Sequence, residues 1–130
     1  MARPPDAGSA IVEFVMVAVL LLTLLFGVIQ VAVYLHVRDV VAASAVEGAR
    51  YGALAGVDDP GRGAERTLAL IRSAVGTRAA AAVRCTGSRG DAAGLPTVRV
   101  RCTGELPPVF APAGGVLPID VSAEAVAEVP

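Results

Sequence analysis

The sequence predicts an α+β protein: a long N-terminal transmembrane helix that continues into a small extracytoplasmic domain with a second helix and a short antiparallel sheet. Three observations support this class: an uncharged apolar run near the N-terminus, helical periodicity beyond it, and period-two alternation in the C-terminal part. The 130 residues leave room for one small domain besides the helix. We expect a leader at 1–8, a long helix at 9–56 with its transmembrane part at 14–35, and the domain at 57–130.

The membrane segment is predicted from Phe14 to Leu35. This stretch has no charged residue, and its only polar residues are Thr23, Gln30 and Tyr34. About 20 residues suffice to cross a bilayer core of roughly 30 Å as a helix. A core helix of a water-soluble protein would show a polar face, which this stretch lacks.

A cleaved signal peptide is the first alternative, because Ala43-Ser44-Ala45 is an A-x-A site downstream of the apolar run. However, the run is longer than the roughly 7–15 residues of a signal h-region, and the N-terminal region holds acidic Asp6 and Glu13 with only Arg3 as a basic side chain. These features favour a segment that stays in the membrane.

The long helix is expected to begin at about Ser9, because residues 1–8 are too rich in Pro and Gly to be helical. No breaker follows until Gly56 and the Asp-Asp-Pro-Gly turn at 58–61. Only the first half of such a helix fits in a membrane, so residues 37–55 must project beyond it.

The projecting half carries a stripe of small residues: Ser44, Gly48 and Gly52, with Ala45 and Ala49 beside them. Each glycine costs a helix up to about 1 kcal/mol relative to alanine. Close approach by another helix or by the domain would compensate for that cost. The alternative is that Gly and Ala are simply common in this chain.

A second helix is predicted at 64–75, where apolar residues recur at helical spacing while Arg66 and Arg72 point elsewhere. Gly76 is its expected stop. The helix could begin as early as Pro60 with Asp59 as its N-cap, although Gly61 would weaken that turn.

Alternating apolar and polar residues predict three strands: a short one at 83–85, a second at 97–103 and a third at 119–129. We expect a loop between the first two, formed by Gly87, Gly90, Gly94 and Pro96, and a connector before the third, with Pro107-Pro108 and Gly114-Gly115. The apolar face of this sheet could be covered by both helices.

Cys85 and Cys102 lie on the apolar parity of their strands, so antiparallel pairing favours a disulfide between them over two buried free thiols. Closing such a loop is worth roughly 3 kcal/mol. The spacing is not C-x-x-C, so it suggests neither a redox dithiol nor a zinc half-site. A disulfide requires an extracytoplasmic domain and therefore a cytoplasmic N-terminus; the charges flanking the span give only a weak orientation bias.

The sequence shows no sign of an enzyme. Its single histidine, His36, directly follows the apolar run, and no nucleophile elbow, P-loop, zinc-protease or dinucleotide motif occurs. Asp58-Asp59 is read more simply as a turn and helix cap than as a metal site. The net charge of −1 argues against nucleic-acid binding. We therefore expect no cofactor, no metal and no small-molecule substrate, and a function in assembly.

The segment from Gly8 to Gly56 resembles the N-terminal region of TadE-like minor pilins (pseudopilins) of the tight-adherence, or Flp-type, type IV pilus system. The matching pieces are Gly8, a Glu-Phe pair at Glu13 and Phe14, the apolar helix, and the downstream "EGARYGA" at 47–53. The resemblance implies a type IV pilin-like fold and cleavage of the Gly8–Ser9 bond by a membrane prepilin peptidase.

In that family, the glutamate that becomes the fifth residue after cleavage is associated with assembly, and here it would be Glu13. It is thought to pair with the N-terminal amine of a neighbouring subunit, here that of Ser9. The implied partners are the membrane, the prepilin peptidase, other pilin or minor pilin subunits and the pilus assembly platform. This leader has only Arg3 as a basic side chain, fewer than is usual.

The alternatives differ in their mature N-terminus. A processed pilin-like subunit, in the cell membrane or a surface pilus, begins at Ser9. A single-pass anchored binding or structural protein that is not processed keeps Met1 or Ala2, and a domain secreted after cleavage at Ala45 begins at Val46.

Overall fold

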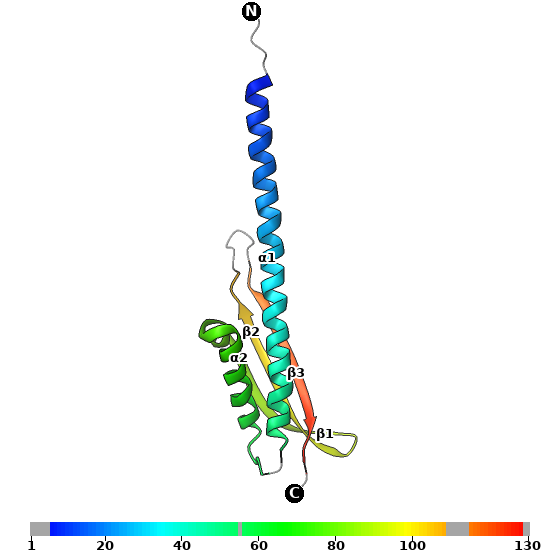
Figure 1. The fold of residues 1–130 in the computed structure, drawn as a ribbon. Coiled ribbons are helices and arrows are strands. Elements are labelled where there is room, and N and C mark those ends of the chain that lie inside the picture. The colour runs from blue at the N-terminus through cyan, green and yellow to red at the C-terminus, as the bar shows by residue number, and fades with distance from the viewer. Residues whose placement is uncertain (1–5, 55, 109–114, 129–130) are drawn as a thin grey trace, which may run out of the picture.

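The computed structural model describes residues 6–54, 56–108 and 115–128, with only the backbone of Asp6 and Ala7 described. It has two helices and a three-stranded antiparallel sheet in these residues: α1 (Asp6–Gly52), α2 (Gly61–Ala81), β1 (Val83–Ala92), β2 (Leu95–Leu106) and β3 (Leu117–Val126). The sheet order is β1-β2-β3. Both helices cover one face of the sheet, and α1 extends far beyond it (Figure 1). This architecture confirms the predicted α+β class.

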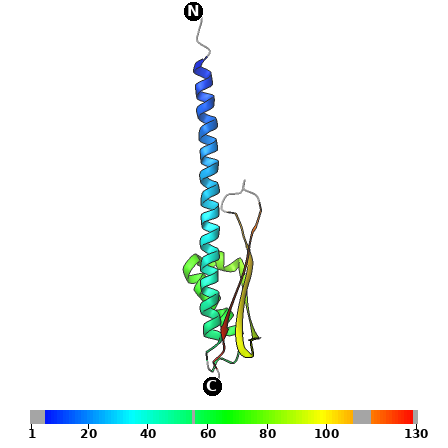
Figure 2. The same ribbon diagram turned by 90° about the vertical axis from the view of Figure 1, so that its right-hand side faces the viewer.

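The helix α1 is 47 residues long, which corresponds to roughly 70 Å. Its first part, residues 6–29, extends beyond α2 and the described strands (Figure 2), and we call it the stem. No described side chain of the stem is buried. The second part, residues 30–52, packs on α2 and the sheet, and we call it the docked half.

The bounds of α1 correct the prediction at both ends. The helix begins at Asp6 rather than at about Ser9, so residues 6–8 of the expected leader are helical; residues 1–5 lie outside the described residues. The helix ends at Gly52, and the turn that follows brings the chain back toward α2 with Gly56 at a φ of 86°. A single Gly inside a helix costs only about 1 kcal/mol, which explains why Gly8 does not end it.

The helix α2 is longer than the predicted 64–75. Gly76 interrupts it with a φ of 86° and a ψ of 170°, as an expected stop would, but a further helical turn follows before β1. At the N-terminus the side chain of Asp59 accepts a hydrogen bond from the Gly61 N–H at 2.8 Å. Asp59 is therefore not the expected N-cap: the N-cap is Pro60, which makes no side-chain cap hydrogen bond, and Asp59 accepts from Gly61 at the residue before it.

The strands β1 and β2 are also longer than predicted, because the expected glycine loop between them is mostly strand. Gly87, Gly90 and Pro96 lie within the β1–β2 ladder, and the turn is only Ala93-Gly94. A Cβ on Gly87 would lie 1.9 Å from the Pro60 carbonyl oxygen, so this glycine is required by close approach to the α1–α2 turn. Glycines at such approaches resemble loop glycines in sequence.

The third strand keeps the predicted alternation. Ile119 is buried, and Val121, Ala123 and Ala125 pack against the core, while the residues between them face solvent. The strand ends at Val126; residue 129 lies outside the described residues. Most of the predicted connector, including Gly114, also lies outside them.

The core lies between the docked half and the sheet. Its fully buried side chains include Val41 of α1, Ile71 of α2, and Val100 and Cys102 of β2. The opposite face of the sheet is polar and open to solvent, with Arg99, Arg101 and Asp120 exposed on it. The domain therefore depends on α1 for its core, and the docked half and the sheet form one unit.

Candidate assembly site on the N-terminal helix

The predicted cleavage and assembly residues all lie on the stem. Gly8, Ser9 and Glu13 are exposed, and the ring of Phe14 is 74% exposed. A Cβ placed on Gly8 would have nothing within 4 Å. The first buried side chain along the helix is Gln30, so these residues precede the buried part of the helix by about four to six turns.

Glu13 is presented without an internal partner among the described residues. Salt bridges join Arg99 to Glu124 and Arg101 to Asp120 on the open face of the sheet, and neither involves Glu13. Ser9 and Glu13 are four residues apart on one continuous helix and therefore share a face. A group that meets the Glu13 carboxylate must come from outside the described part of this chain.

The stem itself is an exposed apolar surface. Residues 8–52 are long and apolar enough to span a membrane, and the most apolar stretch within them is not covered by the domain. Large side chains such as Leu20, Leu24 and Val28 are each more than half exposed. Monomeric soluble proteins rarely expose so large a patch. The stem fits a membrane anchor.

The stripe of small residues lies against α2 of the same chain. A Cβ on Gly48 would lie 1.8 Å from the Thr67 hydroxyl oxygen and 2.5 Å from the Gly63 carbonyl oxygen. Gly52 is less closely packed, since an added Cβ would lie 3.1 Å from Cγ1 of Val98 and 3.4 Å from Cα of Gly63. The stripe is therefore occupied within the subunit, and it offers no free surface at Gly48 to another subunit.

Thr67 is the other half of this helix contact, and the sequence interpretation missed it. Its side chain is fully buried, and its hydroxyl lies 2.9 Å from the Gly63 carbonyl oxygen and 3.3 Å from that of Ser44, as a donor to both. The sequence pattern that could have indicated this contact is the four-residue spacing of Gly63 and Thr67 on α2, which matches the spacing of Ser44 and Gly48 on α1.

Cys85 and Cys102 form a disulfide between directly opposed residues of β1 and β2. Both side chains face the helices, with exposed fractions of 9% and 0%. The bridge joins the edge strand to the central strand beneath the docked half.

The open face of the sheet carries two ion pairs across β2 and β3. The Arg101 guanidinium lies 3.0 and 2.7 Å from the two carboxylate oxygens of Asp120, which lowers the pKa of Asp120 and raises that of Arg101. A hydrogen bond from the Thr97 hydroxyl, and then one from Arg99, lowers the pKa of Glu124. These partners were not predicted, although their strand parity was.

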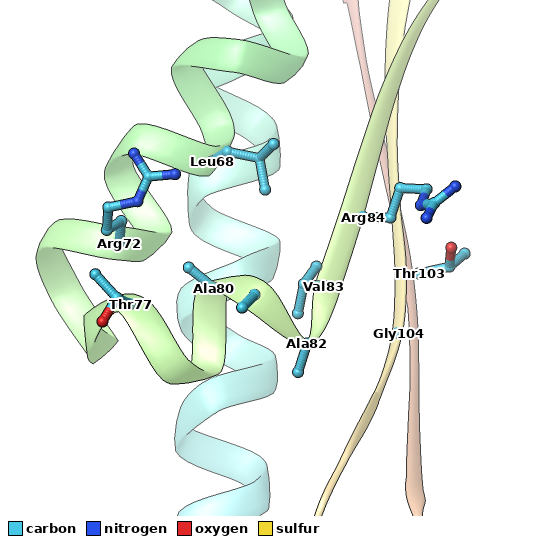
Figure 3. A pocket seen from close by; sticks show the side chains of 10 residues that line it. Leu68, Arg72, Thr77, Ala80, Ala82, Val83, Arg84, Thr103 and Gly104 are labelled. Carbon is cyan, nitrogen blue, oxygen red and sulfur yellow. The ribbon is translucent and has the colours of Figure 1, made fainter.

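A depression lies outside the stem, and its lining gives no support for a catalytic site. It lies between the end of α2 and the start of β1, and its lining contains no acidic residue, His or Cys. Its two basic side chains do not converge: Arg72 lies on α2, and Arg84 points away from α2 beyond β1 (Figure 3). Among the described residues no group of three His, Cys, Asp or Glu could hold a metal ion, and His36 is exposed.

Fold and stem together define a class: a small α+β domain built on the second half of a long helix whose first half is exposed, apolar and suited to a membrane anchor. The comparison with protein families is more specific, because the family model of TadE-like proteins matches residues 8–50. The match covers the stem with Gly8 and Glu13 and most of the docked half, and it confirms the resemblance to TadE-like proteins over this segment. No curated protein and no solved structure matches the chain.

Proposed function

We propose that this chain is a non-enzymatic minor pilin-like subunit of a Flp/Tad-type pilus, cut after Gly8 by a prepilin peptidase and then assembled through Glu13. The single observation that carries the proposal is the TadE-like match over residues 8–50, within which Gly8 and Glu13 stand on a bare apolar helix. The pilus serves adhesion or secretion. The N-terminus is cytoplasmic and the disulfide-bonded domain extracytoplasmic.

The chemistry of the stem supports assembly. Cleavage after Gly8 would create an ammonium group on Ser9, one helical turn from the Glu13 carboxylate and on the same face. When apolar helices pack together, both charges are unfavourable unless they are paired. Pairing the amine of one subunit with Glu13 of its neighbour would satisfy both groups and set the axial register.

The helical start at Asp6 adds a condition to the processing step. The Gly8–Ser9 bond lies inside a helix, and a protease needs an extended substrate, so residues 6–9 must unwind at the peptidase. Gly8 eases this step because glycine destabilises a helix by about 1 kcal/mol relative to alanine.

Cleavage after Ala45 is disfavoured by the core. Ala45 is fully buried in the docked half, and its removal with the preceding residues would take Val37 and Val41 away from the sheet. An unprocessed single-pass anchor remains the second candidate function, favoured by a leader with one basic residue.

The mature N-terminus tests the proposal. The chain is expressed with its own peptidase, and the N-terminal peptide is identified by mass spectrometry. Ser9 is the expected first residue, and Met1 or Ala2 would contradict processing. A strain with an inactive peptidase provides the control, in which the leader should remain.

Glu13→Ala tests the assembly step separately. We expect normal cleavage and membrane insertion, but a tenfold or greater loss of the subunit from purified pili, as the loss of about 1.4 kcal/mol of pairing energy would give. Glu47→Ala is the matched control, since Glu47 is an exposed glutamate on the docked half of the same helix. Equal incorporation of the two variants would rule out the pairing role of Glu13.

A further inference from the structure

One end of the sheet lies beside the part of α1 that is predicted to be in the membrane. We call the described residues on either side of the β2–β3 link, 106–108 and 115–118, the connector ends. The Tyr34 hydroxyl donates a hydrogen bond to the Pro118 carbonyl oxygen at 2.8 Å. Gln30, one turn earlier, is only 9% exposed. Both residues fall within the predicted span 14–35.

The two ends of the sheet lie at different heights along α1. Figures 1 and 2 show the β2–β3 end pointing toward the stem, while the β1–β2 turn and the chain's C-terminus lie at the far end of the docked half. The strands run roughly along α1. When the stem crosses a bilayer, the β2–β3 end is therefore the part of the sheet nearest to the membrane.

The position of Glu13 fixes how deep this end lies. With the carboxylate at the inner surface, the hydrocarbon begins at Phe14, and about 20 residues reach Val33. Tyr34 then lies at the outer interface, where tyrosine is enriched, and Pro118 lies beside it. Raising the helix enough to clear the connector ends would draw Glu13 into hydrocarbon, which is costly.

The composition of this end suits a lipid surface. The connector ends contain no charged residue, and the side chain of Val116 within them is 56% exposed. The opposite end of the sheet differs, since Val126 is 55% exposed but lies near charged Glu128 and, on the paired strands, Asp91.

We propose that the connector ends rest in the headgroup layer of the outer leaflet, so that the subunit touches the membrane at a second place besides the stem. The occupant of this surface is lipid, because the surface is continuous with the membrane-spanning helix. The contact holds the strands along the bilayer normal and fixes the height of the domain. The inference goes beyond the role in a pilus and holds for a single subunit in a membrane.

Tryptophan substitution tests the proposal directly, because the chain has no Trp of its own. The full chain is placed as single copies in phosphatidylcholine–phosphatidylglycerol nanodiscs, with and without lipids brominated near the headgroup. Val116→Trp should give a blue-shifted emission that brominated lipid quenches by at least half. Val126→Trp, equally exposed at the other end, should emit as in water and be quenched by iodide instead.

Leu25→Trp, in the middle of the span, reports insertion, and lipids brominated deep in the acyl chains should quench it. Quenching of this variant but not of Val116→Trp overturns the proposal and leaves the pilus role untouched. A contact with a second copy instead of lipid gives this same result, because each disc holds one copy. Loss of quenching in Leu25→Trp as well overturns the membrane placement and the proposal with it.

Discussion

The stem and the docked half are parts of one unbroken helix, but their side chains differ in size and in burial. The stem carries large apolar residues on every side, as exemplified by Leu24, and it buries none of its described side chains. The docked half carries Ala, Ser and Gly on the face that meets α2 and is fully buried at Ala45 and Ala49. Large side chains suit lipid and packing with other subunits, whereas small ones allow a second helix of the same chain to approach.

This difference shows which glycines of the helix are required by close packing. Gly27 on the stem has nothing within 4 Å of an added Cβ, whereas a Cβ on Gly48 would overlap Thr67. The two residues lie on the same helix, and both would gain helix propensity from substitution. Only their surroundings differ, which makes them a matched pair.

The largest expected effect comes from Gly48→Leu. The added side chain has no room against Thr67 and Gly63, so we expect the free energy of unfolding of the domain to fall by about 3 kcal/mol or more. Both tyrosines, Tyr34 and Tyr51, lie in the docked half, so urea unfolding followed by tyrosine fluorescence in detergent reports this region.

Gly27→Leu is the control and should leave that transition unchanged. An equal loss of stability in both variants would break the distinction between the stem and the docked half, since it would trace the effect to the helix and not to the contact with α2.

The sequence predicts the features that leave a pattern among neighbouring residues, and it does not predict contacts between residues that are distant in the chain. The apolar run, the alternating strand residues and the parity of Cys85 and Cys102 are local patterns, and they correctly predicted the fold class, the long apolar helix and the disulfide. The prediction of Gly87 as a loop residue is wrong, because glycine is required there by a close contact with Pro60, which is distant in sequence. Local composition cannot distinguish a turn glycine from one at a close approach.

The candidate site divides in the same way. The spacing of Gly8 and Glu13 is readable from the sequence, and the structure adds that both are exposed on a helix that already includes Gly8. The sequence predicts that the small-residue stripe meets another helix or the domain, but it does not indicate that the contact is made by Thr67 and Gly63 of α2. The hydrogen bond from Tyr34 to Pro118 joins residues 84 apart and has no local signal.

The next largest effect is expected from loss of the disulfide. Cys85 and Cys102 are 17 residues apart, and closing a loop of about this size contributes roughly 3 kcal/mol in the chain-entropy model. The Cys85→Ala/Cys102→Ala double variant should lower the urea midpoint of the tyrosine signal, while the helical circular dichroism of the stem persists in detergent. If the stem lost its helicity together with the domain, the two halves of α1 would be one cooperative unit.

The smallest expected effect is a loss of domain stability at acid pH, which arises from the ion pairs on the open face of the sheet. Hydrogen bonds from Thr97 and Arg99 lower the pKa of Glu124 below its ordinary value of 4.5, so its carboxylate stabilises the folded state above that pH. This contribution is lost as the pH falls through the lowered pKa, and Asp120 behaves in the same way beside Arg101. Because these groups are on the open face, solvent screening keeps the effect small.

We therefore expect the urea midpoint of the domain to fall modestly when the pH drops from 6 to 3.5, and we expect Glu124→Gln to reduce this fall. Glu47→Gln, which replaces an exposed glutamate of the docked half, should leave the fall intact. A Glu124→Gln variant with the full pH dependence of the parent would show that the Thr97 and Arg99 contacts contribute nothing to folding. The stem, whose stability does not depend on these pairs, should show no change in helicity over the same range.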